Sequence, residues 1–145
     1  GGIGSGKAML ASFALGAEGV QVGSKFAVCK ESSAHQHFKQ FVFDAGDGAT
    51  KLTLKEITPV RMLKNDFYNK IKQAYINCAS KEELTVLLGK SRAKKGIFEG
   101  NIIDGELEIG QIASMIDKMQ TAAEIIEELI VEFNAEKANL LKINF

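Results

Sequence analysis

The sequence predicts an α/β fold, and the first thirty residues carry the observations that predict it. Residues 1–6 form a glycine-rich loop, residues 7–15 have the apolar spacing of a helix, and Gly16 is a suitable helix stop. Residues 19–23 then have the composition of a short strand that ends on a glycine. Loop, helix and strand in this order form the second half of a βαβ unit, which is typical of a parallel sheet. Because one strand cannot make such a sheet, we expect only part of a larger fold.

Length and composition are those of an ordinary globular protein. The chain has 145 residues, of which 46% are hydrophobic and 25% charged. Eighteen basic residues balance eighteen acidic ones, so no net charge favours binding to nucleic acid or to an acidic membrane. No apolar run approaches the ~18–20 residues that a membrane-spanning helix needs. We therefore expect neither a nucleic-acid nor a membrane partner.

A few residues indicate the cellular compartment of the protein and whether it could bind a metal. Cys29 and Cys78 lie far apart without metal-ligand spacing, which favours reduced thiols and a cytoplasmic protein. His35 and His37 have no third ligand nearby, so no metal site is expected. The chain begins Gly-Gly-Ile with no visible targeting segment, and this start suggests a piece of something longer.

The middle of the chain alternates strand, helix and turn patterns. Period-two alternation predicts a half-buried strand over residues 51–57, and apolar spacing predicts a helix over residues 67–77. Ser-Lys-Glu-Glu at the start of residues 80–88 is a capping box, and Gly89 would end that helix. Residues 96–110 contain several glycines and are expected to be rich in turns.

Residues 111–145 have helical periodicity. A second capping box at residues 121–124 predicts two helices with a break near Gln120. Their apolar stripe favours a core role, with an exposed partner-binding helix as the alternative. The stripe consists of Ile112, Met115, Ile116, Met119, Ala122, Ala123, Ile126, Leu129, Ile130 and Phe133.

A basic run at residues 90–95 has two interpretations. It could dock a phosphate or an acidic acyl-carrier protein, or it could be a solvated helix face. The second interpretation is favoured because basic runs are commonly solvated surface.

Two glycine corners are candidate phosphate sites. Residues 1–7 fit the P-loop spacing G-x-x-x-x-G-K, but Ala8 follows where a nucleotide triphosphatase needs a hydroxyl for magnesium. A glycine corner before a helix still presents backbone N–H groups to an anion. Gly23 and Ser24 form a second such corner after the predicted strand. In (β/α)₈ barrels the loops after strands seven and eight commonly make a phosphate site of this kind.

Motifs spread over nearly the whole chain resemble one family of flavoenzymes. The resemblance is carried by G-G-I at residues 1–3, F-A-L-G-A-E-G-V-Q-V-G-S at 13–24 and K-E-S-S-A-H at 30–35. It continues through P-V-R at residues 59–61, K-N at 64–65, F-E-G at 98–100 and G-Q-I at 110–112. This combination resembles the nitronate monooxygenases, formerly 2-nitropropane dioxygenases, and their relatives the FMN-dependent enoyl-acyl-carrier-protein reductases.

The resemblance implies a domain organisation. It implies the C-terminal part of a TIM-type (β/α)₈ barrel that binds FMN, with an inserted small, mostly helical domain. Residues 1–30 would be the last βα units of the barrel, residues 31–108 the inserted domain, and residues 109–145 C-terminal helices that pack back on the barrel. A barrel takes roughly 200–250 residues, so this chain alone cannot close one.

The resemblance also implies site residues. The Gly2 amide would contact the FMN phosphate, and Gln111 would lie near the flavin and substrate, although Ile109 replaces a small residue of the family there. The residues that match cofactor-binding positions are Gly2, Ile3, Gln21, Val22, Gly23 and Ser24. The family's catalytic histidine lies before this chain begins, and neither histidine of this chain matches it.

Three functions follow as expectations. The leading one is an FMN-dependent oxidoreductase of nitronate monooxygenase type, which oxidises alkyl nitronates with O₂. The first alternative is an enoyl-acyl-carrier-protein reductase of fatty acid synthesis that uses FMN and NAD(P)H. The second is a non-enzymatic helical interaction fragment built on residues 67–88 and 112–141. An isolated chain would expose apolar surface, so we expect weak FMN binding and a homodimer or an unstable protein.

Overall fold

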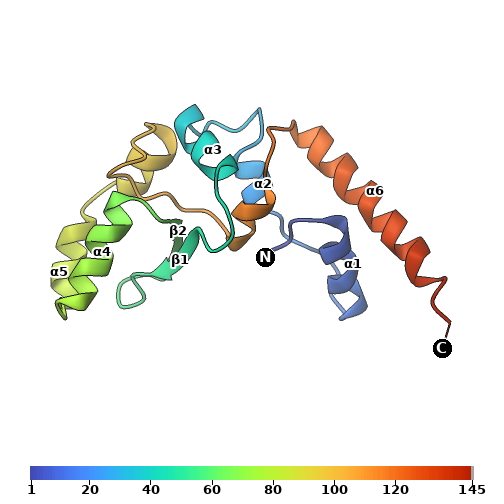
Figure 1. The fold of residues 1–145 in the computed structure, drawn as a ribbon, viewed down its shortest axis with the longest axis horizontal. Coiled ribbons are helices and arrows are strands. Elements are labelled where there is room, and N and C mark those ends of the chain that lie inside the picture. The colour runs from blue at the N-terminus through green and yellow to red at the C-terminus, as the bar shows by residue number, and fades with distance from the viewer. Residues whose placement is uncertain (145) are drawn as a thin grey trace. The chain divides into compact units, whose positions relative to one another are not determined.

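The computed structural model describes residues 1–144, which divide into two compact units (Figure 1). The terminal unit joins Gly1–Ser32 to residues 118–144, so it contains both ends of the described chain. The central unit is Ser33–Asp117. Each unit has its own buried apolar cluster.

The terminal unit consists of three helices: α1 (Gly6–Ala14), α2 (Ser24–Ala27) and α6 (Ala122–Leu140). The predicted helix at residues 7–15 is confirmed as α1. The predicted capping box of α6 is confirmed too, because the Thr121 hydroxyl accepts a hydrogen bond from the Glu124 N–H and the Glu124 carboxylate accepts one from the Thr121 N–H. Helix α1 packs along α6.

The predicted strand at residues 19–23 is wrong. Those residues are irregular between α1 and α2, and no strand is found in the terminal unit within residues 1–144. A strand is stabilised by backbone hydrogen bonds to a neighbouring strand. The described part of this unit supplies no such neighbour, so the predicted parallel sheet is not formed there.

The core of the terminal unit is small. Cys29, Ile125 and Leu129 are buried, and Met9, Val22 and Phe26 pack against them. Ile126 and Ile130, which the predicted apolar stripe includes, are 49% and 50% exposed. The stripe is therefore core only in part, because the inward face of α6 passes through Ile125 instead of Ile126.

The central unit contains the sheet. Strands β1 (Thr50–Thr53) and β2 (Val60–Leu63) pair antiparallel, and an isolated bridge joins Met62 to Glu108. The predicted strand at residues 51–57 is confirmed only at its start, because Leu54 adopts a positive φ of 53° that ends it. Strand β2 was not predicted, since its last two residues are both buried and it lacks period-two alternation.

Three helices of the central unit have clear capping residues: α3 (Gln36–Phe43), α4 (Asp66–Ile76) and α5 (Lys81–Leu88). The predictions at residues 67–77 and 80–88 are confirmed by α4 and α5. Ser80 and Glu83 form the predicted capping box, and Gly89 ends α5 at φ 65°. Helix α3 was not predicted.

Two irregular helices follow in the central unit, a π-helix η1 (Lys94–Phe98) and a 3₁₀ helix η2 (Gln111–Met115). The first of the two predicted C-terminal helices is therefore a short 3₁₀ turn. Gly96 and Gly105 bring two backbone segments into contact, because a Cβ on Gly105 would overlap the Gly96 backbone.

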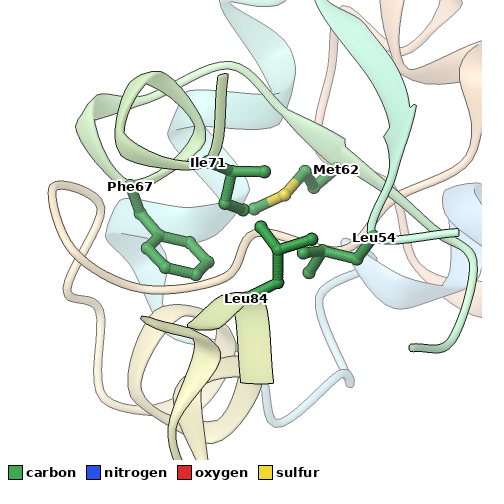
Figure 2. Close-up of a cluster of buried hydrophobic side chains, with 5 residues drawn as sticks. All are labelled: Leu54, Met62, Phe67, Ile71 and Leu84. Atoms are coloured by element: carbon green, nitrogen blue, oxygen red, sulfur yellow. The ribbon is translucent and has the colours of Figure 1, made fainter. Parts of the chain in front are cut away.

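One buried apolar cluster of the central unit forms where the sheet meets α4 and α5. Figure 2 shows its buried side chains converging between these elements: Leu54, Met62, Phe67, Ile71 and Leu84. Seven further apolar residues pack against this cluster. The core explains why the apolar positions of α4 and α5 were recognisable in the sequence.

No helix in residues 1–144 is both long enough and apolar enough to cross a membrane.

Candidate functional site

Helix α6 holds the starts of α1 and α2 next to each other. The Glu132 carboxylate accepts a hydrogen bond of 2.7 Å from the Gly6 N–H, at the first residue of α1. The Glu128 carboxylate lies 2.6 Å from the Lys25 ammonium, in the first turn of α2. Side chains four apart on a helix are neighbours on one face. The two glycine corners, which are separate in the sequence, are thus brought together by two carboxylates one helical turn apart.

The backbone N–H groups at the start of α1 are largely occupied. Besides the Gly6–Glu132 bond, the Ser5 hydroxyl accepts from the Ala8 N–H at 3.1 Å, and the Ser5 carbonyl accepts from the Met9 N–H at 3.1 Å. A carboxylate already lies where an anion would approach this helix. The phosphate site expected at the first glycine corner is therefore not available at the α1 start itself.

The start of α2 is different. Gly23 is its N-cap and has no side chain with which to cap it. A Cβ built on Gly23 would meet no atom within 4 Å, so there is open space beside this glycine. The first N–H groups of a helix have no partner inside the helix and carry the positive end of its dipole. Helix α2 is a single turn of four residues, and N–H groups at a helix start favour a nearby anion.

A buried ion-pair network supports α2. Lys25 is only 6% exposed, and Glu128 also accepts bonds from Lys118 at 2.8 Å and from Gln120 at 2.8 Å. Hydrogen bonds from Lys118, then from Lys25, lower the pKa of Glu128 to about 2. Lys25 and Glu128 were missed by sequence reasoning. The only indication was a lysine within the apolar segment that follows Gly23.

The predicted cofactor-binding residues all lie in the terminal unit. Gly2 is exposed with a positive φ of 79°, which favours glycine at that position. Ile3 is half-buried, Gln21 is exposed, and Val22 packs against the apolar cluster.

Gln111 lies in the central unit instead. It is the first residue of η2 and is exposed, two residues after the buried Ile109.

The two histidines form a local cap. His35 is the N-cap of α3, its Nδ1 accepts from the His37 N–H at 3.1 Å, and the two rings lie 4.6 Å apart. Gly100, at φ 74°, packs beneath the His35 ring, where a Cβ would overlap it. The E-S-S-A-H motif thus has a structural role here, since its histidine begins a helix.

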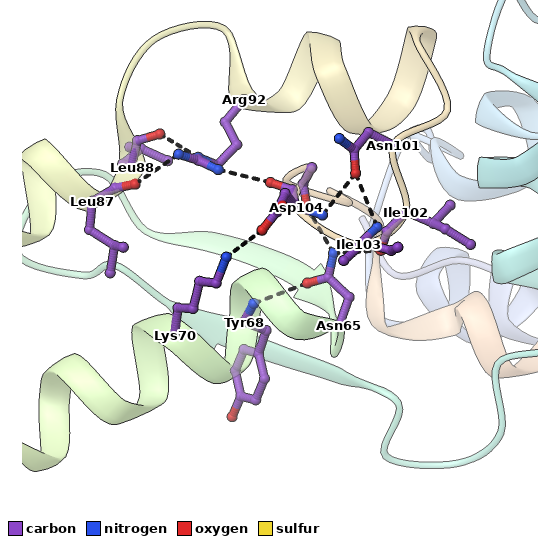
Figure 3. A network of polar contacts seen from close by, with 11 residues as sticks. Asn65, Tyr68, Lys70, Leu87, Leu88, Arg92, Asn101, Ile102, Ile103 and Asp104 are labelled. Atoms are coloured by element: carbon purple, nitrogen blue, oxygen red, sulfur yellow. Dashed lines mark hydrogen bonds and ion pairs between the residues drawn. The ribbon is translucent and has the colours of Figure 1, made fainter.

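Arg92 anchors the basic run to the central unit. Figure 3 shows its guanidinium donating to backbone carbonyls of Leu88 at 2.6 Å, Asp104 at 2.9 Å and Leu87 at 3.1 Å. It also lies 4.3 Å above the Phe67 ring. Arg92 therefore stabilises the fold, whereas the lysines of the run are exposed.

Glu106 is the second acid with a strongly shifted pKa. It is 7% exposed, and burial, with repulsion from Glu108, raises its pKa to about 7 against an opposing effect of Arg92. No sequence pattern marked this residue.

Comparisons with known proteins place these features in a family. The family model described as nitronate monooxygenase matches residues 1–132. A probable nitronate monooxygenase of Staphylococcus saprophyticus is 32% identical over 139 residues, covering 92% of this chain and 38% of that protein.

Solved structures agree with the family model. FabK of Thermotoga maritima is 32% identical with a TM-score of 0.84, over 97% of this chain and 44% of that one. A nitroalkane oxidase of Streptomyces ansochromogenes is 26% identical with a TM-score of 0.73, over 96% of this chain and 39% of that one. Both are TIM-barrel enzymes, and this chain spans less than half the length of either. The chain belongs to the nitronate monooxygenase family.

Proposed function

We propose that this chain is the C-terminal part of an FMN-dependent oxidoreductase that oxidises alkyl nitronates with O₂. Family membership supports the oxidoreductase class. The observation that carries the cofactor assignment is the start of α2, where the glycine N-cap Gly23 has open space beside it. That start matches the phosphate end of FMN in charge and in accessibility.

The residues of the terminal unit fit a phosphate-bearing cofactor. The N–H groups at the start of α2, with the Ser24 hydroxyl, would hold the phosphate, and Gly2 would approach it through backbone that lacks a side chain. FMN supplies the redox chemistry when bound. The protein's own part is to fix α2 through Lys25 and Glu128, so that these donors need no reorganisation when the phosphate arrives.

Affinity for FMN and for riboflavin, which lacks the phosphate, tests this assignment. The two should differ at least tenfold, and Ser24→Ala should weaken FMN binding roughly five-fold while leaving riboflavin unchanged, as the loss of one hydrogen bond implies. Ser33→Ala is the matched control, because Ser33 is exposed and lies outside the terminal unit. Equal weakening of both flavins by Ser24→Ala would contradict a phosphate role.

The substrate is tested on the polypeptide that carries this sequence, loaded with FMN. Oxygen uptake with an alkyl nitronate supports the proposal. Oxidation of NAD(P)H with an enoyl thioester, and no oxygen uptake with the nitronate, would favour the alternative, an enoyl-acyl-carrier-protein reductase. The α2 start would bind FMN in either enzyme, so the outcome of this assay does not affect the cofactor assignment.

We also infer that the central unit is the domain that the family inserts into its barrel. It is compact, it has its own core, and its bounds of Ser33–Asp117 include the expected residues 31–108 except for the first two.

A further inference from the structure

A groove on the central unit has no role in the proposed reaction. It has a volume of about 390 Å³ and lies between β1, the turn after it, and α4. Tyr68, Lys72 and Tyr75 line it from α4 with spacings of four and three, so they share one helix face. Leu52 and Ile76, both exposed, add apolar surface.

The rim of this groove is positively charged. Lys51, Lys55 and Lys72 line it, and within residues 1–144 none of them has a carboxylate at ion-pair distance. The only acid that lines it is Glu56, whose carboxylate accepts a hydrogen bond of 2.5 Å from the Tyr75 hydroxyl. Burial and this bond raise the pKa of Tyr75, so the phenol stays neutral. Three lysines against one carboxylate leave an excess of positive charge.

We propose that this groove binds a small molecule that carries a phosphate group on an apolar or aromatic body. Lysine ammonium groups are effective partners for phosphate, and the tyrosine faces with the apolar side chains would contact the body of the ligand. The volume lies at the lower end of the ~300–1,000 Å³ of small-molecule sites, which suits one compact ligand. None of the groove residues is among those assigned to FMN, so this proposal stands or falls separately from the proposed function.

The composition of the chain gives the groove its own spectroscopic probe. The sequence contains two tyrosines and no tryptophan, and both tyrosines line the groove. In a polypeptide of this sequence, the tyrosine fluorescence therefore comes from this site. The probe ligand is 4′-phosphopantetheine, a phosphate on a flexible chain that does not absorb where tyrosine is excited.

Titration with 4′-phosphopantetheine should change the tyrosine fluorescence saturably. Pantetheine and inorganic phosphate, the two halves of the probe, should each bind more weakly than the whole. Adenosine monophosphate, followed by calorimetry because its base absorbs, tests whether an aromatic body is preferred. Tighter binding of either phosphate ester than of inorganic phosphate supports the proposal. Equal affinity for 4′-phosphopantetheine, adenosine monophosphate and inorganic phosphate would overturn it, because the groove would then attract anions non-specifically.

Charge removal tests the site itself. Lys72→Gln should weaken 4′-phosphopantetheine binding roughly two- to five-fold, and adding Lys51→Gln should weaken it roughly ten-fold, as expected for exposed ion pairs. Lys81→Gln is the matched control and should leave the affinity unchanged, because Lys81 is exposed at the start of α5 and lies outside the groove. Unchanged affinity in the double variant, or tighter binding of an acidic peptide than of either phosphate ester, would overturn the proposal.

Discussion

The two units of this chain are stabilised in different ways. The central unit has five buried side chains in one apolar cluster and a guanidinium that binds three backbone carbonyls. The terminal unit has three buried side chains in its cluster and depends on carboxylates of α6 that hold α1 and α2. The proposed cofactor site lies in the unit with the smaller core. Its geometry is therefore set by polar contacts and close backbone packing more than by apolar burial.

The largest predicted effect is at the contact between α1 and α6. A Cβ on Gly6 would overlap backbone atoms of Leu129 and Phe133, so Gly6→Ala should force the helices apart and cost about 3 kcal/mol. Hydrogen exchange of α1 and α6 measures the loss. Gly46→Ala is the control, because a Cβ there meets no atom within 4 Å. Unaltered exchange of both helices in Gly6→Ala would show that the units are not stabilised as described.

The next effect concerns Glu106, whose ionisation makes the stability of the central unit depend on pH. Its pKa is about 7 in the folded protein against 4.5 in the unfolded chain, so the carboxyl lowers stability progressively as pH rises from about 4.5 to 7. Glu106→Gln should remove this loss and stabilise the central unit by about 2 kcal/mol above pH 7, with little effect at pH 4.

Urea unfolding followed by tyrosine fluorescence measures this change, because both tyrosines lie in the central unit. Glu108→Gln should have a smaller effect, since burial is the larger cause of the raised pKa. A stabilisation that is the same at pH 4 and pH 8 would contradict the assignment.

The smallest effect comes from substituting Glu128. The stability that Glu128 contributes depends on pH with the opposite sign to that of Glu106. Its pKa is lowered to about 2, so its contribution is present above about pH 4.5 and is lost as pH falls towards 2. Glu128→Gln should destabilise the terminal unit by about 1 kcal/mol at pH 7, a value discounted for partial solvent exposure. Hydrogen exchange of α2 measures it, with the exposed Glu127→Gln as control. A larger effect on α4 than on α2 would contradict the network described.

Local signals predicted the helices well. The capping boxes at Ser80 and Thr121 fixed the starts of α5 and α6, because their hydrogen bonds join residues only three apart. Elements that depend on distant partners were not predictable in this way. The segment at residues 19–23 has strand composition but no neighbouring strand within the described residues. Strand β2 lacks alternation because its last two residues are both buried.

The candidate site also combines features that local sequence predicts with contacts between distant residues that it does not. Gly23 was recognisable as a glycine corner after a predicted strand. The contact between Lys25 and Glu128 that supports α2 joins residues 103 positions apart, which no local pattern reveals. The hydrogen bond at the first residue of α1 depends on Glu132, which is 126 positions away from Gly6. Sequence reasoning therefore found the two corners but could not show that a carboxylate binds at the start of α1.

Hydrogen exchange of residues 22–26, measured with saturating FMN and with saturating riboflavin, tests the central claim most directly. The claim is that the start of α2, at its glycine N-cap Gly23, holds the cofactor's phosphate. We predict that FMN slows exchange at residues 22–26 much more than riboflavin does, while α5 exchanges at the same rate with either flavin. Equal protection of residues 22–26 by the two flavins, or no protection by FMN, would contradict the claim.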